Sequence, residues 1–471
     1  MVEYNKVTDA VIQELKEKVS GKIYVAEDIN VDLYRDEMPI YGEGKPEVVI
    51  EPLNTEDVAA AVKVCYENNI PVVPRGCGSG LVGAGVAING GLMLDMRQFN
   101  KIIDYDEANF TVTVEPGVLL RDLAEDCDKK GYLYPPDPGE KVATLGGNVS
   151  TNAGGMRAVK YGTTRDYVRK MEVVLPTGEI TTFGANVSKT SSGYSLLHLM
   201  IGSEGTLGII TKLLLEIIPK PTEDLSIIVP YENLEDCIST VPFLFKNHLE
   251  PQSVEFMERE IVEASERFVG KSVFPTNIGG QEAAAYLLIR FDGNDADELM
   301  DVVERAAEVV LEHGAIDVLV ADTPEKKKEA WLARGAFLEA IEAESELLDE
   351  CDVVVPVSEI ANYLTFVKKE AENYDFELKT FGHAGDGNLH IYTTSNTMDK
   401  EEFLEQVDEF MEVIYQRAYE VNGTLSGEHG VGHGKRKYLA EFENKATINL
   451  MKAIKLAFDP KQILNPGKVI G

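Results

Sequence analysis

Four of the seven histidines lie in two short glycine-rich segments whose composition is typical of metal sites. The first segment is His383-Ala-Gly-Asp-Gly-Asn-Leu-His390, and the second is Gly427-Glu-His-Gly-Val-Gly-His433. Imidazole nitrogens and carboxylate oxygens bind divalent ions such as Zn²⁺, Fe²⁺ and Mn²⁺. Three protein ligands, His383, His390 and Glu428, would leave open positions on one such ion, as in catalytic rather than structural metal sites.

The spacing of the first segment predicts a β-hairpin. Its centre, Gly385-Asp-Gly-Asn388, is a strong turn sequence, because glycine and asparagine tolerate positive φ. We expect His383 to lie directly opposite His390, with Cβ atoms about 5 Å apart. His429, beside Glu428, is left for other work, and proton transfer suits it because imidazole titrates near neutral pH. The alternative is a hairpin with two structural histidines, and Asp386 is expected to cap its own turn.

The surrounding sequence predicts α+β architecture. Residues 8–19 and 56–68 have helical patterns, and residues 46–220 are rich in glycine and short strand-like runs. Pro219-Lys-Pro221 indicates a break in the chain. After it, strand-like and long helical segments alternate over 224–229, 231–247, 253–269, 284–291 and 295–313, and acidic helices are expected at 325–350 and 401–421.

Three glycine-rich segments precede that break. They are Pro74–Gly85, Leu145–Gly155 (preceded by Pro135-Pro-Asp-Pro-Gly139) and Ile201–Ile210. Such segments expose successive backbone N–H groups, which can bind a pyrophosphate. They match neither the dinucleotide fingerprint nor a P-loop. Tight turns in a β-rich domain are the alternative, but three such loops favour one large cofactor lying across them.

Composition restricts the class of protein. A chain of 471 residues is long enough for two or more domains. Its net charge of −35 argues against nucleic acid or an anionic membrane as partner. We expect no signal peptide and no integral membrane segment, and the five scattered cysteines predict a reducing cytoplasm. Because no CxxC pair occurs, an iron–sulfur cluster within this chain is not expected.

The three glycine-rich segments, taken in order with later motifs, resemble the FAD-linked 2-hydroxy-acid dehydrogenases of the vanillyl-alcohol oxidase type. The later motifs are Trp331-Leu-Ala-Arg334, the two histidine segments and Leu464-Asn-Pro-Gly-Lys468. That family includes D-lactate dehydrogenases, the glycolate oxidase flavin subunit and D-2-hydroxyglutarate dehydrogenase. The resemblance covers about residue 40 to the end. It implies an FAD-binding domain over 1–220, a cap or substrate domain over 221–422, and a segment 423–471 that returns to the FAD domain.

The resemblance also implies roles for individual residues. It implies that FAD contacts Pro74, Arg75, Gly76, Cys77, Gly78, Ser79, Gly80, Leu81, Pro138, Gly139, Thr144, Gly147, Asn148, Thr151, Gly154, Gly202, Glu204, Gly205, Ile209, Asn465 and Lys468. Some relatives attach FAD through a histidine in the first loop. The comparable position here is Ser79, so non-covalent FAD is expected, with Cys77 a remote alternative for attachment.

The implied reaction is oxidation of a small D-2-hydroxy acid, foremost D-lactate to pyruvate. A metal on His383, His390 and Glu428 would orient the substrate and acidify its hydroxyl. His429 would take the hydroxyl proton, Arg334 would clamp the carboxylate and Asn388 would contact the substrate. Hydroxyglutarate-type relatives tend to have a basic residue near this position, which suits a second carboxylate. Glu350 would instead repel a second carboxylate. Glycolate and D-2-hydroxyglutarate remain alternative substrates, and a non-redox FAD transferase or an electron-relay subunit are alternative functions.

The electrons must leave the flavin for an acceptor outside this chain. A separate electron-transfer flavoprotein is the leading expectation, possibly within a bifurcating complex that uses NAD⁺. An iron–sulfur subunit, as in glycolate oxidase, and a membrane quinone are the alternatives.

Overall fold

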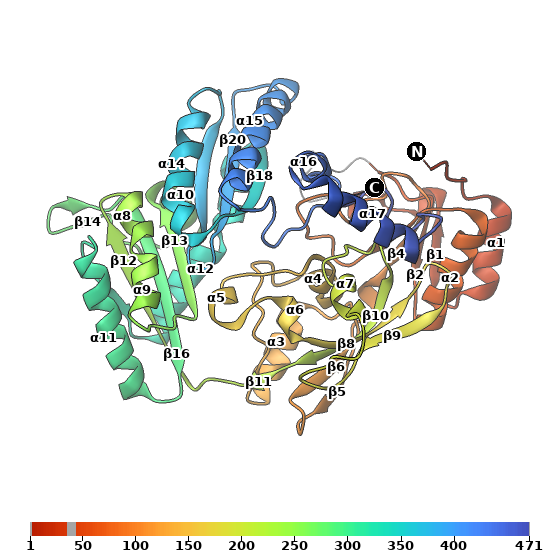
Figure 1. Cartoon of the computed structure of the whole chain (residues 1–471), viewed down its shortest axis with the longest axis horizontal. Helices are drawn as coiled ribbons and strands as arrows, with labels where there is room; N and C mark the ends of the chain where they lie inside the picture. Colours follow the sequence, from red (N-terminus) through yellow and green to blue (C-terminus); the bar gives the residue numbers. More distant parts are fainter. Residues whose placement is uncertain (1, 35–43, 471) are drawn as a thin grey trace. The chain divides into compact units, whose positions relative to one another are not determined.

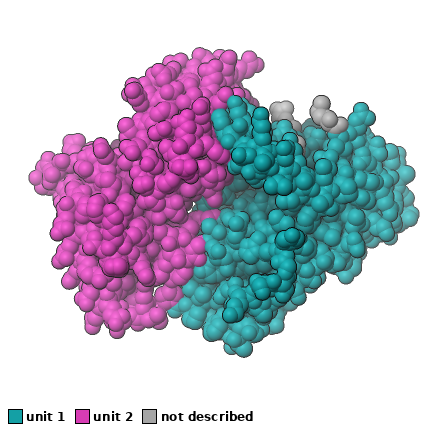
Figure 2. Space-filling model, viewed as in Figure 1, with its two compact units in different colours: residues 1–153, 163–220, 428–471 teal, residues 154–162, 221–427 magenta. Residues whose placement is uncertain are grey.

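The structure is a computed structural model that describes residues 2–34 and 44–470. The chain forms two compact units, coloured separately in Figure 2. Unit 1 comprises Met1–Ala153, Thr163–Lys220 and Glu428–Gly471. Unit 2 comprises Pro221–Gly427 and the short segment Gly154–Gly162. Unit 1 is therefore assembled from both ends of the chain.

Unit 1 contains two main sheets (Figure 1). The first has the strand order β1-β2-β4-β3, with β2, β4 and β3 parallel and β1 antiparallel, and the second is antiparallel in the order β5-β6-β10-β8-β9. A short pair, β7 and β11, is separate. The strands are β1 Lys22–Val25, β2 Val48–Glu51, β3 Val72–Arg75, β4 Leu92–Asp95, β5 Ile102–Asp106, β6 Thr111–Val114, β7 Tyr132–Leu133, β8 Val168–Val174, β9 Ile180–Gly184, β10 Ile209–Glu216 and β11 Ile218–Pro219.

The parallel strands of unit 1 are apolar on both faces, as strands covered from both sides must be. The α-helices of this unit are α1 Asp9–Lys18, α2 Thr55–Asn68, α3 Leu120–Lys129, α4 Leu145–Thr151, α6 Thr164–Tyr167, α7 Leu196–Met200, α16 Arg436–Phe442 and α17 Lys445–Phe458. Its 3₁₀ helices are η1 Ala26–Asp28, η2 Val31–Tyr34 and η4 Met96–Gln98. Helices α1 and α2 pack over β2 and β4 in a core that includes Val58, Val62 and Leu94.

The end of the chain returns to the free edge of β3. The Val72 N–H donates to the Ile463 carbonyl (2.8 Å), and the Asn465 N–H donates to the Val72 carbonyl (2.8 Å). Ile463 and Leu464 are fully buried in the core of the first sheet. The C-terminal segment therefore completes unit 1 as an additional edge of its parallel sheet.

Unit 2 is built on one antiparallel sheet with the order β17-β12-β16-β13-β19-β20-β18. These strands are β12 Glu223–Tyr231, β13 Ser253–Glu258, β16 Ala285–Gly293, β17 Leu319–Ala321, β18 Leu347–Val354, β19 Glu377–His383 and β20 Asn388–Ser395, beside the hairpin β14 Asn277–Ile278 and β15 Gln281–Glu282. The helices are α5 Ala158–Tyr161, α8 Leu234–Ser239, α9 Val241–Lys246, α10 Arg259–Val269, α11 Ala296–Glu312, α12 Pro324–Gly335, α13 Phe337–Glu344, η5 Val357–Glu359, α14 Ile360–Ala371 and α15 Lys400–Glu420.

One face of this sheet is covered by α10, α12 and α13. Their buried side chains pack with Met257, Phe381 and Tyr392, which lie on three neighbouring strands. Because side chains alternate between faces, residues two positions from these three also face α10, α12 and α13. Glu255, His383 and His390 are such residues, so the first histidine segment lies on the helix-covered face.

Two expected helices were wrong in part. The segment 253–269 begins with strand β13 and becomes helical only at Arg259, and the segment 325–350 ends in strand β18. The segment 231–247 is two short helices, α8 and α9. The other expected elements named above are present, and no helix in the described part of the chain is long and apolar enough to cross a membrane.

Candidate active site

A row of polar side chains crosses four adjacent strands of unit 2 at one end of the sheet. Going across the sheet, β13 contributes Glu255, β19 His383, β20 Asn388 and His390, and β18 Glu350 and Asp352. All of them share the face covered by α10, α12 and α13, as the strand registers require. All are buried. Buried charges are stable only when they are paired, so their contacts define what the row can do.

The two histidines face each other diagonally rather than directly. The expected pairing of His383 with His390 is wrong, because Asn388 belongs to β20 and pairs with His383, while His390 pairs with Phe381. The residues that connect β19 to β20 are therefore Ala384–Gly387. The pairing of the two strands is shifted by two residues from the expected register. Since a shift of two keeps side chains on the same face, the imidazoles still meet, with ring centroids 5.4 Å apart.

Glu255 fixes the orientation of the His383 ring. Both carboxylate oxygens of Glu255 lie 2.9 Å from His383 Nδ1. Burial acts to raise the pKa of Glu255, but its contacts with His383 and Arg334 outweigh burial and hold the pKa below its usual range. Glu255 is therefore an anionic acceptor for an Nδ1 proton, which leaves His383 Nε2 to act as a ligand.

Glu350 makes the corresponding contact with the second histidine. Its Oε1 lies 3.4 Å from His390 Nδ1. Both imidazoles therefore place Nδ1 next to a buried carboxylate. This carboxylate–histidine pairing is the arrangement that sets the tautomer and ring orientation of histidine metal ligands.

Glu428 and His429 follow directly after Gly427, whose N–H donates to Asp352 Oδ2 (3.0 Å) in unit 2. Ligand atoms of His383, His390 and Glu428 all lie within 4.8 Å of one another, and so do those of Glu350, His390 and His429. Two imidazoles and a carboxylate are a chemically suitable donor set for Zn²⁺, Fe²⁺ or Mn²⁺. The residues fit a divalent ion.

Arg334 lies on α12 and is paired with the same carboxylate as His383. Its Nε and Nη2 donate to Glu255 Oε2 at 2.9 and 2.7 Å, and its guanidinium lies 4.9 Å from the Phe381 ring centroid. Only 7% of Arg334 is exposed. Because a guanidinium carries five donors, this pairing leaves others for a ligand. Arg334, Glu255 and His383 form one continuous chain of contacts.

Asn388 and Asp386 occupy the turn between β19 and β20. Asn388 Nδ2 donates to Asp352 Oδ1 (2.7 Å), which leaves its side-chain oxygen as the group that can meet a substrate. The Asn388 N–H donates to Asp386 Oδ1 (3.2 Å). The expectation that Asp386 caps its own turn is confirmed.

The three glycine-rich loops meet within unit 1. A Cβ atom on Gly76 would lie 2.1 Å from Thr144 Oγ1, and one on Gly205 would lie 2.5 Å from Pro74 Cγ. Nearby, Asn148 Nδ2 is buried without a hydrogen-bond partner among the described residues. Side-chain-free backbone and an unpaired donor in one place fit a large polar cofactor such as FAD.

Several residues assigned to FAD by resemblance have protein partners that stabilise the loops. Arg75 Nη1 donates to the Gly85 carbonyl (3.0 Å), and Lys468 Nζ donates to the Val86 carbonyl (2.6 Å). Asn465 Nδ2 donates to the carbonyls of Ala84 (2.9 Å) and Glu204 (2.7 Å). These side chains maintain the shape of the first loop, whichever contacts they also make with a cofactor.

Glu204 lies in the third loop and binds the segment after His429. Its carboxylate accepts hydrogen bonds from the N–H groups of Val431 (2.8 Å) and Gly432 (2.8 Å). Burial raises the pKa of Glu204 to about 7, against the opposing effect of those two N–H groups. Cys77, in the first loop, is half-buried, and burial raises the pKa of its thiol, which disfavours the thiolate needed for covalent attachment.

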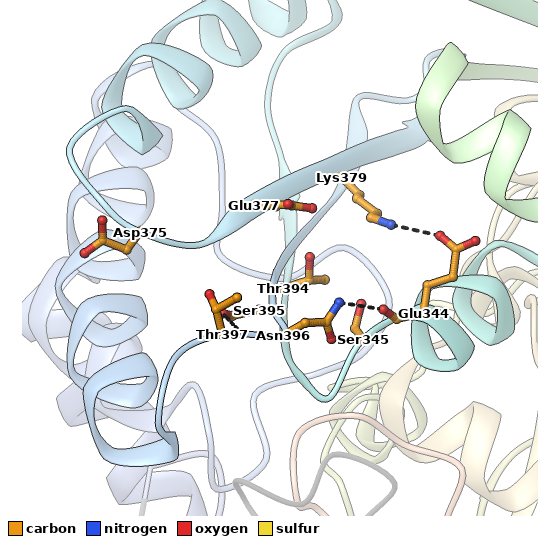
Figure 3. Close-up of a pocket in the computed structure, with 9 residues that line it drawn as sticks. All are labelled: Glu344, Ser345, Asp375, Glu377, Lys379, Thr394, Ser395, Asn396 and Thr397. Carbon is orange, nitrogen blue, oxygen red and sulfur yellow. Dashed lines mark hydrogen bonds and ion pairs between the residues drawn. The ribbon is translucent and has the colours of Figure 1, made fainter.

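A separate polar pocket of about 190 Å³ lies at the other end of the same strands (Figure 3). It includes Glu377 at the start of β19 and Thr394 near the end of β20. Its Glu344 pairs with Lys379 and Arg267, and the Asn396 amide donates to the Glu344 carbonyl. These groups satisfy one another, and the pocket is remote from the histidines.

Sequence reasoning missed Glu255 and Asp352 and assigned Glu350 only to substrate selection. Glu255 lay in a segment expected to be helical, and Glu350 at the end of another. A usable signal was present for Glu255, because it interrupts the apolar run Val254-Glu-Phe-Met257, whereas Leu347-Leu-Asp-Glu-Cys-Asp-Val353 carries three acids and gave no such signal. A carboxylate inside a buried strand implies a partner.

Comparisons with known proteins agree with this architecture. Residues 46–184 match the family model described as FAD binding domain, and residues 220–469 match that described as FAD linked oxidases, C-terminal domain. The chain is 60% identical over 467 residues to a D-lactate dehydrogenase of Anaerostipes hadrus, covering 99% of this chain and 98% of that protein. It is 39% identical to the glycolate oxidase subunit GlcD of Bacillus subtilis, covering 92% and 91%.

Solved structures show the same fold at low sequence identity. p-Cresol methylhydroxylase with substrate bound superimposes with a TM-score of 0.80 at 18% identity, covering 100% of this chain and 99% of that one. An alkyldihydroxyacetonephosphate synthase gives 0.75 at 19% identity, covering 99% and 87%. The expected α+β fold of the vanillyl-alcohol oxidase type, which p-cresol methylhydroxylase shares, is confirmed. Given both family models and these relatives, the chain belongs to the FAD-linked oxidases and is an FAD-dependent oxidoreductase.

Proposed function

We propose that this protein oxidises a small D-2-hydroxy acid, foremost D-lactate to pyruvate, with FAD bound non-covalently and one divalent metal ion. The substrate class is supported by the 60% identical relative named D-lactate dehydrogenase and by a second so named, from Archaeoglobus fulgidus, at 39% identity. Residues 1–220 with 423–471 are proposed to bind FAD, and 221–422 to form the substrate domain. All five cysteines lie in the described residues and none is in a disulfide, which supports a reducing cytoplasm as its location.

The observation that carries the metal proposal is the pairing of each imidazole Nδ1 with its own buried carboxylate. Glu255 and Glu350 would keep His383 and His390 in the tautomer that offers Nε2. Glu428 adds the third ligand atom within 4.8 Å. A divalent ion held there would bind the substrate carboxylate and hydroxyl and acidify the hydroxyl.

The remaining groups act directly on the substrate. His429 is proposed to take the hydroxyl proton, because its ligand atom lies within 4.8 Å of those of Glu350 and His390. Arg334, held in place by Glu255, would present its unused donors to the carboxylate. Asn388 would offer its side-chain oxygen. FAD bound to unit 1 would supply the hydride acceptor for the substrate C2.

Glu350 favours a monocarboxylate substrate. It is 2% exposed, and its carboxylate belongs to the polar row beside His390. A second substrate carboxylate placed near it would meet a like charge in a poorly solvated site. D-2-Hydroxyglutarate is therefore the weaker alternative, whereas glycolate lacks only the methyl group of lactate and stays a candidate.

Electrons are proposed to leave for a separate electron-transfer flavoprotein, with a bifurcating complex as one form of that partnership. The support is indirect: the sequence has no CxxC pair for a cluster, and the net charge of −35 suits a complementary basic protein surface. Reduction of a quinone analogue without any added protein, at a rate independent of salt, would count against this acceptor.

Anaerobic flavin spectroscopy tests the proposed reaction. D-lactate, L-lactate, glycolate and D-2-hydroxyglutarate would be added in turn, before and after removal of divalent ions with a chelator. We expect D-lactate to bleach the flavin stoichiometrically, and the chelator to slow the bleaching by orders of magnitude while FAD stays bound. A yellow protein that none of the four acids bleaches would instead favour a non-redox transferase or an electron-relay subunit.

A further inference from the structure

Asp352 is a fully buried carboxylate of the polar row, with no exposed surface. It accepts three hydrogen bonds from neutral groups on two separate segments. Oδ1 accepts from Asn388 Nδ2 (2.7 Å), while Oδ2 accepts from Ser426 Oγ (2.8 Å) and from the Gly427 N–H (3.0 Å). One carboxylate therefore joins the turn after the first histidine to the residues just before Glu428.

The segment that ends at Gly427 is fixed to strand β18 by main-chain contacts as well. Val354 and Thr424 exchange two hydrogen bonds, at 3.0 and 2.8 Å. A Cβ on Gly427 would lie 2.7 Å from both Asn388 Nδ2 and Val354 Cγ2, so only glycine fits. The chain is thus seated closely on the end of β18 immediately before Glu428.

The position of Asp352 in the ladder explains how it can do this. Asp352 is the register partner of His390, so the two side chains lie side by side on one face. The anchor for the Glu428 segment therefore stands next to one of the two histidines. Asp352 lies beside His390 and holds the Gly427 N–H, and Glu428 is the next residue in the chain. Asp352 therefore determines how far Glu428 lies from His390.

We propose that Asp352 is a positioning residue that sets the location of Glu428 and the orientation of the Asn388 amide. It does not touch the metal or the substrate itself. Without it, the two histidines would remain oriented by Glu255 and Glu350, but the third ligand would no longer be held at the common point. This inference deepens the proposed function and rests on the proposed metal site.

The test is metal affinity of the FAD-loaded protein, measured by competition between Asp352→Asn and a chromophoric chelator for Zn²⁺. An asparagine side chain has one acceptor oxygen in place of two, so it cannot accept from both Asn388 Nδ2 and the Gly427 N–H, and we expect affinity to fall about 10–100-fold, as for lost outer-sphere partners of metal ligands. Ser426→Ala removes the hydrogen bond from Ser426 Oγ to Asp352 Oδ2 but keeps the Gly427 N–H contact, and should reduce affinity by a few-fold. Flavin content, read from the visible absorption, should not change in either variant.

Glu266→Gln is the matched control. Glu266 also uses one buried carboxylate to accept from two main-chain N–H groups, those of Val273 and Phe274, in the same unit but outside the polar row. It should leave Zn²⁺ affinity unchanged. The visible spectrum of Co²⁺-loaded protein gives a second readout, because ligand geometry alters its bands. Asp352→Asn should shift that spectrum and Glu266→Gln should not.

The outcomes separate the two proposals. If the unaltered protein binds neither Zn²⁺ nor Co²⁺, the metal site and this inference both fail. If it binds them and Asp352→Asn, folded and yellow, binds them equally well with the same Co²⁺ spectrum, only the positioning role is overturned. Should Asp352→Asn fail to fold, Ser426→Ala decides, since an unchanged affinity there would contradict the anchor.

Discussion

At the scale of single residues, the candidate site depends on carboxylates that need not touch substrate. Glu255, Glu350 and Asp352 are each buried and each orients a group proposed to bind the metal or the substrate. Burying three carboxylates close together is unfavourable unless donors and positive charge compensate for it. The three carboxylates repel one another, and the positive charge of Arg334 compensates part of this repulsion. A divalent ion would compensate more of it.

Replacing Glu255 by glutamine should affect both the metal and the stability of unit 2. His383 would lose its anionic partner, so we expect Zn²⁺ affinity to fall about 10–100-fold. Arg334 would be left as a buried charge without its counter-ion, a change that destabilises proteins by about 3–5 kcal/mol. Chelator competition and urea unfolding measure the two effects. Unaltered unfolding would show that the Arg334–Glu255 pair is not a stabilising contact.

Glu204 should make stability depend on pH around neutrality. Burial raises its pKa from 4.5 to about 7, so the folded protein holds this proton more tightly than the unfolded chain. The contribution of Glu204 to stability is then greatest below pH 4.5 and declines as pH rises through 7. Relative to the natural protein, Glu204→Gln should gain about 3 kcal/mol between pH 4.5 and 8. Urea unfolding at saturating FAD measures this difference, and a pH-independent difference would contradict the raised pKa.

At the scale of elements, the sequence was most informative where pattern and turn chemistry agreed. Strands β2, β3, β4 and β6 and helices α1, α2 and α15 were predictable, because apolar runs or helical faces were bounded by clear turn residues. Strand β13 was harder to predict, since Ser253–Glu258 has neither clean alternation nor a turn before Arg259, and the signal for Glu255 lay only in its apolar neighbours. The observed hairpin register differs by two residues from the expected one. Turn chemistry alone did not decide which four residues connect the two strands.

The close approach of the glycine-rich loops gives an element-scale prediction. Gly205→Ala would place a Cβ 2.5 Å from the Pro74 ring at a φ of +70°, which L side chains rarely adopt. We expect at least a 10-fold loss of FAD affinity, measured by fluorescence titration of the apoprotein. Gly293→Ala is the control, because its Cβ would meet only Leu299, at 3.9 Å. Equal FAD affinity in both variants would show that the loops adapt without loss.

At the scale of the whole molecule, charge is the feature that bears on the electron acceptor. A net charge of −35 should attract a basic protein partner, and salt screens such attraction within about 10 Å at 0.1 M. We expect kcat/KM for an electron-transfer flavoprotein to fall steeply between 20 and 300 mM salt, by roughly 10-fold or more. Reduction of a small neutral dye should hardly change. A salt-independent protein reaction would exclude electrostatic docking.

The return of the chain's last residues to β3 has a consequence for biosynthesis. The edge of β3 is complete only when Ile463 and Asn465 have paired with Val72. At 5–20 residues per second, the ribosome needs roughly 20–80 s to make the intervening chain. During that time a short apolar strand presents unpaired N–H and C=O groups to other nascent chains. We therefore expect chaperones to bind the nascent chain early in translation. We also expect chains truncated before residue 460 to form inclusion bodies.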